Sequence, residues 1–255
     1  IVQTGEGLPI YHEVFAGNTA ESLTLLPTLK TVLERFPSIR RVVLVADRGL
    51  LSLDNLDALC EIRLESGEPL EFVLAVPGRR YSEFTELLRP FHDQHCTRAE
   101  GETIGELPWR NLRLIIAHNP EVARAAQMLR RERIHALEEQ AAAWVGKLDA
   151  QDAGVKARGK KLSDSGAKAR LYHAVKDARL AHIFRVDLKN ALFAYDINQD
   201  ALALAELMDG KLLLVSNTPD LSPKNVVDRY QSLADIECGF RVLKSEIEIG
   251  PVFHR

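Results

Sequence analysis

One aspartate follows a buried strand pattern and could bind a metal ion. The run Val42–Ala46 is apolar and mostly β-branched, and Asp47 comes directly after it, followed by Arg48 and Gly49. In an open α/β sheet, side chains at the carboxyl ends of strands project into the crevice where ligands bind. A carboxylate there suits Mg²⁺ or Mn²⁺, which prefer oxygen ligands. Asp47 could equally cap the following turn, with Gly49 supplying backbone freedom.

A second acidic residue belongs to a polar stripe late in the sequence. Tyr230, Glu237 and Lys244 are spaced by seven residues, so on a helix they share one face. Arg241, four residues after Glu237, joins this face. One phenol, one carboxylate and two cations in a line suit a phosphate backbone and a metal ion. The same spacing is also typical of a solvated helix face with ordinary ion pairs.

Two further polar segments carry side chains that could bind a metal ion or an anion. His92, Asp93, His95 and Cys96 carry donor atoms for zinc, but a structural zinc site needs four well-placed ligands, and the sequence offers no partner cluster. The segment Lys156–Arg185 holds nine Lys or Arg residues and two Asp residues, so it is strongly basic. We therefore do not expect a zinc site there. The basic segment is a candidate DNA-binding surface.

The start of the chain predicts a hairpin and a helix. Ile1–Thr4 and Leu8–Phe15 have the pattern of two antiparallel strands joined by a glycine turn. Asn18 and Glu21 then form a capping-box pattern, since each side chain can bond a free amide of the first helical turn. The helix should reach about Phe36.

The next elements are expected to position Asp47. Arg40–Ala46 is the predicted strand, and the uninterrupted apolar run within it indicates burial on both faces of a mixed or parallel sheet. Leu51–Leu64 has helical spacing, and Leu70–Gly78 is another apolar strand closed by a proline and a glycine. The predicted order is β-β-α-β-α-β, with Asp47 at the carboxyl end of the third strand.

The middle of the chain has a looser pattern and is predicted to be an insertion. It contains loop sequence near Phe91–Arg98, a long amphipathic stretch at Pro120–Leu148, and short strands at Ala191–Tyr195 and Lys211–Val215. The amphipathic stretch is expected to pack the insertion, and a short antiparallel coiled coil is the alternative.

A last helix should carry the polar stripe. Ser222 is a plausible N-cap before Pro223, and the helix is expected to run to about Ile247. The predicted division is therefore residues 1–78 for the first part of the core, 79–221 for the insertion, and 222–255 for the last core helix.

The composition describes a globular protein. The 255 residues are 46% hydrophobic and 27% charged, with a formal net charge of -3. Cys60, Cys96 and Cys238 fit neither a disulfide framework nor a CxxC pattern, so a reducing cytoplasm is expected. No run approaches the roughly 20 apolar residues of a membrane-spanning helix. The sequence begins at Ile1 within a strand pattern and ends at Arg255 without a polar tail, so we expect a fragment of a longer chain.

Four segments carry a family resemblance. They are GLPIYHEVFAGNTAES (Gly7–Ser22), VVLVADRGLLS (Val42–Ser52), DGKLLLVSNT (Asp209–Thr218) and YQSLADIECGFRVLKSEIEIGPVFH (Tyr230–His254). Their order and sequence resemble the DDE transposases of bacterial insertion sequences of the IS4 and IS1634 type. The resemblance implies an α/β, RNase H-like (retroviral integrase-like) core, in which helices flank a mixed sheet and a mixed α/β insertion interrupts it.

The resemblance also implies a catalytic role for two carboxylates. Asp47 corresponds to the second acidic residue of the catalytic triad and Glu237 to the third. These residues would hold two Mg²⁺ or Mn²⁺ ions, which are about 3.5–4 Å apart in such sites, for strand cleavage and strand transfer at element ends. The first acidic residue is expected on a strand before Ile1, so the chain by itself should be inactive.

The same resemblance implies contacts with DNA. The late helix of the family carries the pattern Tyr, two residues, Arg, three residues, Glu, six residues, Lys, and this chain matches it at Tyr230 and Lys244 as well as at the glutamate. It departs from the pattern at Leu233, where the family has arginine, and Arg241 could supply that contact. Arg48, beside the second acid, is a further candidate DNA-binding residue.

The expected partners are transposon ends and target DNA, bound by a homodimer in the bacterial cytoplasm. The basic segment Lys156–Arg185 either contacts transposon DNA, as the family's insertion does, or is a solvated loop and helix. The alternative function is a non-catalytic DNA-binding remnant of a truncated transposase. A cellular RNase H-like nuclease shares the chemistry but gives no reason for the Tyr–Glu–Lys spacing.

Overall fold

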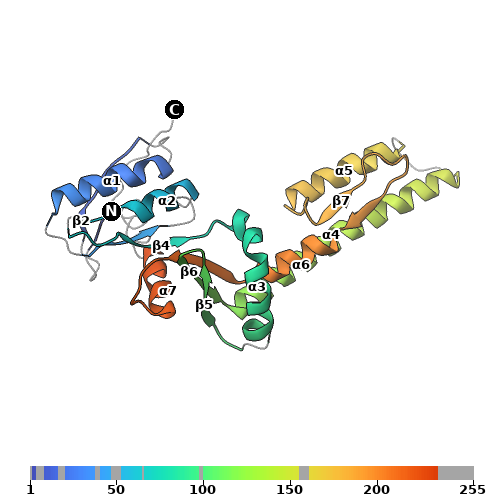
Figure 1. The fold of residues 1–255 in the computed structure, drawn as a ribbon. Coiled ribbons are helices and arrows are strands. Elements are labelled where there is room, and N and C mark those ends of the chain that lie inside the picture. Colours follow the sequence, from blue (N-terminus) through green and yellow to red (C-terminus); the bar gives the residue numbers. More distant parts are fainter. Residues whose placement is uncertain are drawn as a thin grey trace, which may run out of the picture. The chain divides into compact units, whose positions relative to one another are not determined.

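The chain folds into two compact units (Figure 1). The computed structural model describes residues 2–3, 9–16, 21–37, 41–46, 53–64, 66–97, 100–154 and 161–234. Unit 1 combines three stretches of the chain: Ile1–Phe84, Thr103–Ala117 and Leu212–Arg255. Unit 2 comprises Thr85–Glu102 and His118–Lys211.

Unit 1 is built on a five-stranded mixed sheet. Its strands, in spatial order, are β3 (Val43–Ala46), β4 (Glu71–Ala75), β9 (Lys211–Ser216), β6 (Leu112–His118) and β5 (Thr103–Trp109). Strands β3 and β4 are parallel, and β9 pairs antiparallel with β4. The predicted α/β class with a mixed sheet flanked by helices is therefore confirmed.

The first elements follow the predicted order. Strands β1 (Val2–Gln3) and β2 (Pro9–Tyr11) form an antiparallel hairpin, and α1 (Glu21–Arg35) follows. Helix α2 (Leu53–Glu61) connects β3 to β4, which is the crossover that a parallel strand pair requires. The order β-β-α-β-α-β is thus confirmed.

One face of the sheet is covered by helix α7 (Pro223–Gln231). Alternate residues of β4, Val73 and Ala75, pack in one cluster with Val226 and Val227 of α7. Phe72 and Leu74 point to the opposite face, because side chains alternate along a strand, and they too are buried. Burial on both faces therefore holds for β4.

The same expectation was wrong for β3. Val43, Leu44 and Val45 are only half-buried, whereas Ala46 is buried. The reason is position: among the described strands β3 lies at an edge of the sheet with β4 as its neighbour.

Residues 85–118 form more regular structure than the sequence predicted. Strands β5 and β6 were not predicted, yet both are hydrogen-bonded into the same sheet as β3 and β4. Helix α3 (Thr85–Phe91) continues into the π-helical turn His92–Cys96, so the expected loop was wrong there. Thr97 closes this turn, because both its backbone N–H and its hydroxyl donate to the carbonyl of His92.

Unit 2 contains the long predicted helix, α4 (Pro120–Asp152). Asn119 caps it by accepting hydrogen bonds from the first backbone amides, and a proline occupies its first position. The remaining elements are α5 (Asp164–Asp177), β7 (Phe184–Val186), β8 (Tyr195–Ile197) and α6 (Gln199–Met208). Strand β7 was not predicted, and β8 begins at the last residue of the strand expected at 191–195.

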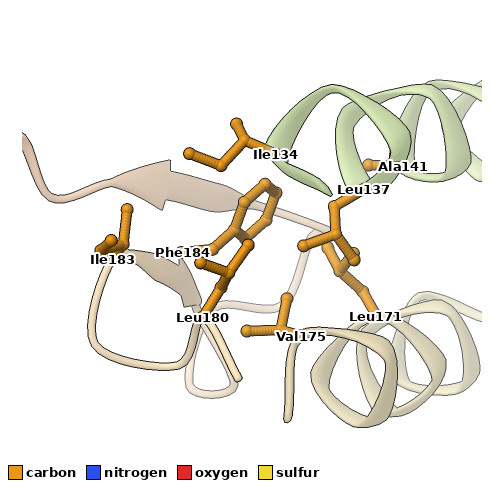
Figure 2. Packing of buried hydrophobic residues seen from close by; sticks show 8 residues of the cluster. All are labelled: Ile134, Leu137, Ala141, Leu171, Val175, Leu180, Ile183 and Phe184. Atoms are coloured by element: carbon orange, nitrogen blue, oxygen red, sulfur yellow. The ribbon is translucent and has the colours of Figure 1, made fainter. Parts of the chain in front are cut away.

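The core of unit 2 joins α4, α5 and the β7–β8 hairpin. Figure 2 shows the ring of Phe184 among Ile134 and Leu137 of α4, Leu171 of α5, and Leu180. Phe184 is 1% exposed, and its ring stacks on Tyr195 of β8 with centroids 4.8 Å apart. The amphipathic stretch thus packs the core of its own unit, as predicted.

A glycine fixes the turn that leads from α6 to β9. Gly210 has φ of +66°, and a Cβ built on it would lie 2.4 Å from the carbonyl oxygen of Asn119. We therefore expect Gly210→Ala to lower the free energy of unfolding of unit 2 by at least about 2 kcal/mol, from backbone strain and a backbone clash. Urea unfolding followed by Trp144 fluorescence measures this loss. Gly154→Ala, also at positive φ but with open space around it, is the control and should lose less.

None of the helices in the described part of the chain has both the length and the apolar character needed to cross a lipid bilayer.

Candidate functional site

The predicted catalytic edge lies where the parallel strands β3 and β4 end. β3 ends at Ala46 and pairs in register with β4, Ala46 opposite Leu74, so both strands finish at the same edge of the sheet. Asp47 is the next residue in the chain after β3, and it lies outside the described residues together with Arg48. The described part of the site is therefore the strand that leads to Asp47, held in place by β4.

Helix α7 begins as predicted. Ser222 is its N-cap, and its hydroxyl accepts a hydrogen bond from the backbone amide of Asn225 at 3.2 Å. Pro223 occupies the first turn, where it needs no N–H donor. Val226 and Val227 are buried against the sheet, so the helix is anchored on the face formed by alternate residues of β3 and β4.

Of the predicted polar stripe, only Tyr230 lies among the described residues. Its ring is partly buried and packs against the apolar cluster that joins α7 to the sheet. Helix α7 ends at Gln231, where Ser232 is the C-cap, so the single helix predicted to reach Ile247 was too long for α7. Glu237, Arg241 and Lys244 lie outside the described residues.

An ion-pair network lies at the other end of β3 and β4, where both strands begin. Arg41, just before β3, donates to Asp220 at 2.6 and 2.9 Å and to Glu71 of β4 at 2.7 Å. Hydrogen bonding to Arg41 holds the pKa of Asp220 below its usual range. This network ties the start of β3 to the connection between β9 and α7. Arg41 and Asp220 are exposed, so the net contribution of their pair is small.

The connection between β9 and α7 is further fixed by buried polar groups. The Asn217 side chain accepts from Phe72 N at 2.8 Å and donates to Leu70 O at 2.8 Å, so it extends the pairing of β4 beyond Ser216. The Ser216 hydroxyl donates to the carbonyl of Phe72 at 2.7 Å. Arg113 of β6 donates to the carbonyl of Thr218 and pairs with Glu106 of β5 at 2.6 Å. These contacts set where α7 starts relative to β3 and β4.

A second polar cluster is buried in unit 2. Lys211 is 6% exposed, and its ammonium group donates to Leu207 O at 2.6 Å and lies 2.9 Å from Nδ1 of His92. A charged lysine has only donors, so His92 Nδ1 accepts and its ring proton is on Nε2. The His118 ring lies 5.9 Å from the His92 ring, and Cys96 is buried nearby in the same unit. His118 Nδ1 is buried without a hydrogen-bond partner in the described structure.

Burial shifts the pKa values of this cluster. Desolvation, and then the positive charge of Lys211, lower the pKa of His118 to about 4 and lower that of His92 as well. Desolvation lowers the pKa of Lys211 and raises that of the Cys96 thiol. The cluster therefore holds neutral imidazoles beside a lysine.

The buried histidines make the stability of unit 2 depend on pH. The unfolded chain takes up a proton at His118 near pH 6.5, whereas the folded chain does so at about 4, so the unfolded state binds more protons in this window. We expect the free energy of unfolding to fall as pH drops from 6.5 towards 4, by up to about 3 kcal/mol from His118. Urea unfolding at pH 7 and pH 5, followed by Trp144 fluorescence, measures this loss.

Two variants give this pH dependence a matched comparison. His118→Gln removes the buried titrating group and should flatten the pH slope. His182→Gln, at an exposed position in the same unit, should leave the slope unchanged. Equal slopes in the His118 variant and the parent chain would show that His118 is not the titrating group.

The described residues contain no group of three or more His, Cys, Asp or Glu side chains placed to hold a metal ion. The carboxylates with the most suitable donor chemistry for a hard cation, Asp47 and Glu237, are outside that set. The structure describes strand β3, which ends just before Asp47, and helix α7, which precedes Glu237 in the sequence.

The basic segment is described from residue 161 onward. Lys168 is buried, and its ammonium group donates to the carbonyl of Asn190. The other cations of this part are exposed: Lys161, Arg170, Lys176, Arg179 and Arg185. Lys176 lies over the ring of Tyr172, 5.1 Å from its centroid.

Comparison with family models, with curated proteins and with solved structures gave no match to this chain.

Sequence reasoning missed the Arg41 network and the Lys211 cluster. Both depend on contacts between residues far apart in the chain: Arg41 and Asp220 are 179 residues apart, and Lys211 and His92 are 119 apart. The available signal was local in each case, a charged residue flanking an apolar strand. A charged residue at the end of a strand is ordinarily exposed to solvent, so the sequence does not predict which residue it contacts.

Proposed function

We propose that the chain is part of the catalytic core of a DDE transposase, which cleaves and joins DNA strands at the ends of an insertion sequence. The observation that carries the proposal is the position of Asp47. It directly follows a strand that pairs in parallel with the next strand, as a catalytic acid of an RNase H-like sheet would. The sequence resemblance supplies the reaction, and the fold supplies the strand that leads to the acid.

The finer fold assignment belongs to the same proposal. An RNase H-like core is supported by the hairpin β1–β2, the helix α1, and the parallel pair β3 and β4 joined through α2. It is also supported by α7, which follows the sheet strands in sequence and packs on the sheet face. The division into residues 1–78, 79–221 and 222–255 remains a prediction. Strands β5, β6 and β9, from its middle range, belong to the same sheet as β3 and β4.

In this proposal, Asp47 and Glu237 hold the catalytic divalent ions. Mg²⁺ or Mn²⁺ bound there would stabilise negative charge on the phosphate oxygens during displacement at phosphorus. The assignment of Glu237 is supported by helix α7, which packs on the face shared by Val43 and Val45 of β3 and precedes Glu237 in the sequence.

The cationic and phenolic side chains bind the DNA backbone. Arg48, Arg241 and Lys244 would place positive charge against phosphates, which positions DNA without reading its sequence. The Tyr230 ring packs on the sheet cluster, and in this proposal its hydroxyl contacts the DNA backbone. Its partial burial would hold that hydroxyl in a fixed place.

The test is metal-dependent nicking of DNA that carries the inverted-repeat ends of the element. The resemblance implies a first acid upstream of Ile1, so the assay compares the chain of residues 1–255 with a version extended through that strand. The extended chain should nick the ends in Mg²⁺ or Mn²⁺ and lose all activity in EDTA. DNA binding by the extended chain with no nicking in either metal would favour a non-catalytic DNA-binding protein.

A further inference from the structure

The loop between β7 and β8, Asp187–Ala194, is held rigidly by its own polar side chains. Oδ1 of Asp187 accepts from the amides of Lys189 at 2.9 Å and Asn190 at 3.0 Å. Oδ1 of Asn190 accepts from the amide of Leu192 at 3.1 Å. The two ends are joined by a bond from Asp187 N to Ala194 O at 3.0 Å. The loop therefore has a fixed backbone although it lies on the surface.

Helix α5 adds two contacts that fasten the loop to unit 2. Oδ1 of Asp164 accepts from the amide of Phe193 at 2.7 Å, and the buried ammonium group of Lys168 donates to the carbonyl of Asn190. The side chain of Phe193 packs against the core of unit 2 and lies edge-on to Trp144, with ring centroids 6.5 Å apart. One aromatic residue thus anchors the loop from inside.

Two leucines on the same loop face solvent. Leu188 is 55% exposed and Leu192 is 69% exposed. Since Phe193 already provides the apolar anchor, the leucines contribute little to the packing of their own unit. A rigid loop that presents two apolar side chains loses little conformational entropy when they bind a partner.

The charge around the loop favours an anionic partner. Residues 161–197 contain seven Lys or Arg residues, four Asp and no Glu, in a chain whose formal net charge is -3. Two of the four acids, Asp164 and Asp187, are hydrogen-bonded to loop amides. Within the described residues, none of the seven cations forms an ion pair with a carboxylate, whereas arginines elsewhere, such as Arg41, Arg113 and Arg130, do.

We propose that the Asp187–Ala194 loop is a DNA-contacting element whose leucines wedge against the base stack while Lys189 and neighbouring cations bind phosphates. Duplex DNA offers a partner for both kinds of side chain, because each base-pair step has apolar base faces flanked by anionic phosphates. Apolar side chains inserted between base pairs are a known mode of groove binding. An anionic bilayer offers the same charge, but two leucines bury little area in it, and stable membrane anchoring takes more. The choice of DNA as the partner rests on the proposed function, whereas the rigid loop and its exposed leucines do not.

The experiment measures binding of the full chain to duplex DNA in EDTA over a series of salt concentrations. The double variant Leu188→Ser/Leu192→Ser should bind at least about tenfold more weakly at each salt concentration, with an unchanged slope of log K against log salt, because leucine releases no counterions. It should also lose the permanganate reactivity that unstacked thymines show in the wild-type complex. Lys189→Gln should instead reduce the slope by about one.

A matched control uses exposed apolar residues elsewhere in unit 2. Met128 and Leu129 on α4 are 62% and 47% exposed, and Met128→Ser/Leu129→Ser should bind DNA as the wild type does. Equal loss in the two double variants, or none in either, would overturn the proposal. So would leucine-dependent binding to phosphatidylserine-containing vesicles combined with leucine-independent binding to DNA.

The outcome is separable from that of the proposed function. Binding is measured without a divalent ion, so it does not require a metal-loaded catalytic site. Leucine-dependent binding without nicking would reject the catalytic assignment alone. Nicking with no effect of the leucine variant on DNA binding would reject this loop assignment alone.

Discussion

Asp47→Asn and Glu237→Gln should each lower the rate of Mg²⁺-dependent nicking by at least about 10³-fold in the chain that includes the upstream acid. Each change keeps the size of the side chain and removes the negative charge that would hold a divalent ion. In the proposed mechanism the ions would supply most of the stabilisation of charge at phosphorus, so losing one ligand would remove much of the rate enhancement. The measurement is the single-turnover nicking rate on inverted-repeat DNA.

Two further measurements separate a catalytic loss from a folding defect. Both variants should unfold at the same urea concentration as the parent chain, and both should retain their affinity for DNA in EDTA. Asp220→Asn is the matched control, because this acid lies at the other end of β3 and β4, where it pairs with Arg41. Its nicking rate should stay within a few-fold of the parent rate. Nicking that survives in both Asp47→Asn and Glu237→Gln would remove the two carboxylates from the mechanism.

Phe184→Ala should lower the free energy of unfolding of unit 2 by about 3–5 kcal/mol. Phe184 is 1% exposed, lies at the centre of the unit 2 core, and stacks on Tyr195. Its removal leaves a cavity among residues from α4 and α5, and well-ordered helices close such a cavity only partly. Trp144 packs against this cluster, so its fluorescence in a Trp109→Phe background reports unfolding of unit 2 during a urea titration.

An exposed residue from the same hairpin gives the comparison. Leu192→Ala, at a site 69% exposed, should change the free energy of unfolding by less than about 0.5 kcal/mol. A Phe184→Ala effect no larger than that of Leu192→Ala would contradict the packing around Phe184. The leucine variants used for DNA binding should likewise leave folding intact, because they lie outside this core.

Local patterns predicted the elements that lead to Asp47. The apolar run before Asp47, the helical spacing of α2 and the apolar run of β4 each lie within one segment, so each is readable without knowledge of its neighbours. The cap of α7 was equally readable, since Ser222 and Pro223 act on the first turn alone. These elements give the strand before the predicted acid and the start of the predicted helix.

Elements with mixed local signals were missed. Gly105 and Pro108 interrupt the strand pattern in the sequence of β5. The turn into β6 has Arg110 at φ of 54°, where glycine or asparagine is the usual residue. The pairing of β9 with β4 joins residues far apart in the chain, such as Val73 and Ser216, which no periodicity reveals. In the π-helical turn at His92–Cys96, His92 contacts Lys211, which is 119 residues away in the chain.

Interrupted helices limited the prediction of the polar stripe. The seven-residue spacing of Tyr230, Glu237 and Lys244 assumes one continuous helix, but α7 ends at Gln231. Leu233 and Ala234, the last described residues, are helical again after Ser232. The proposal requires that Asp47 and Glu237 bind the same metal ions. It does not require that Tyr230, Glu237 and Lys244 belong to one continuous helix.

The most direct test of the account is the anomalous diffraction of Mn²⁺ in crystals of the upstream-extended chain bound to its DNA ends. Mn²⁺ peaks are expected at the carboxyl ends of β3 and β4, with Asp47 and Glu237 both coordinating the metal through carboxylate oxygens. A map in which either carboxylate is instead paired with a cationic side chain, or in which the two carboxylates lie too far apart to share the metal site, would contradict it.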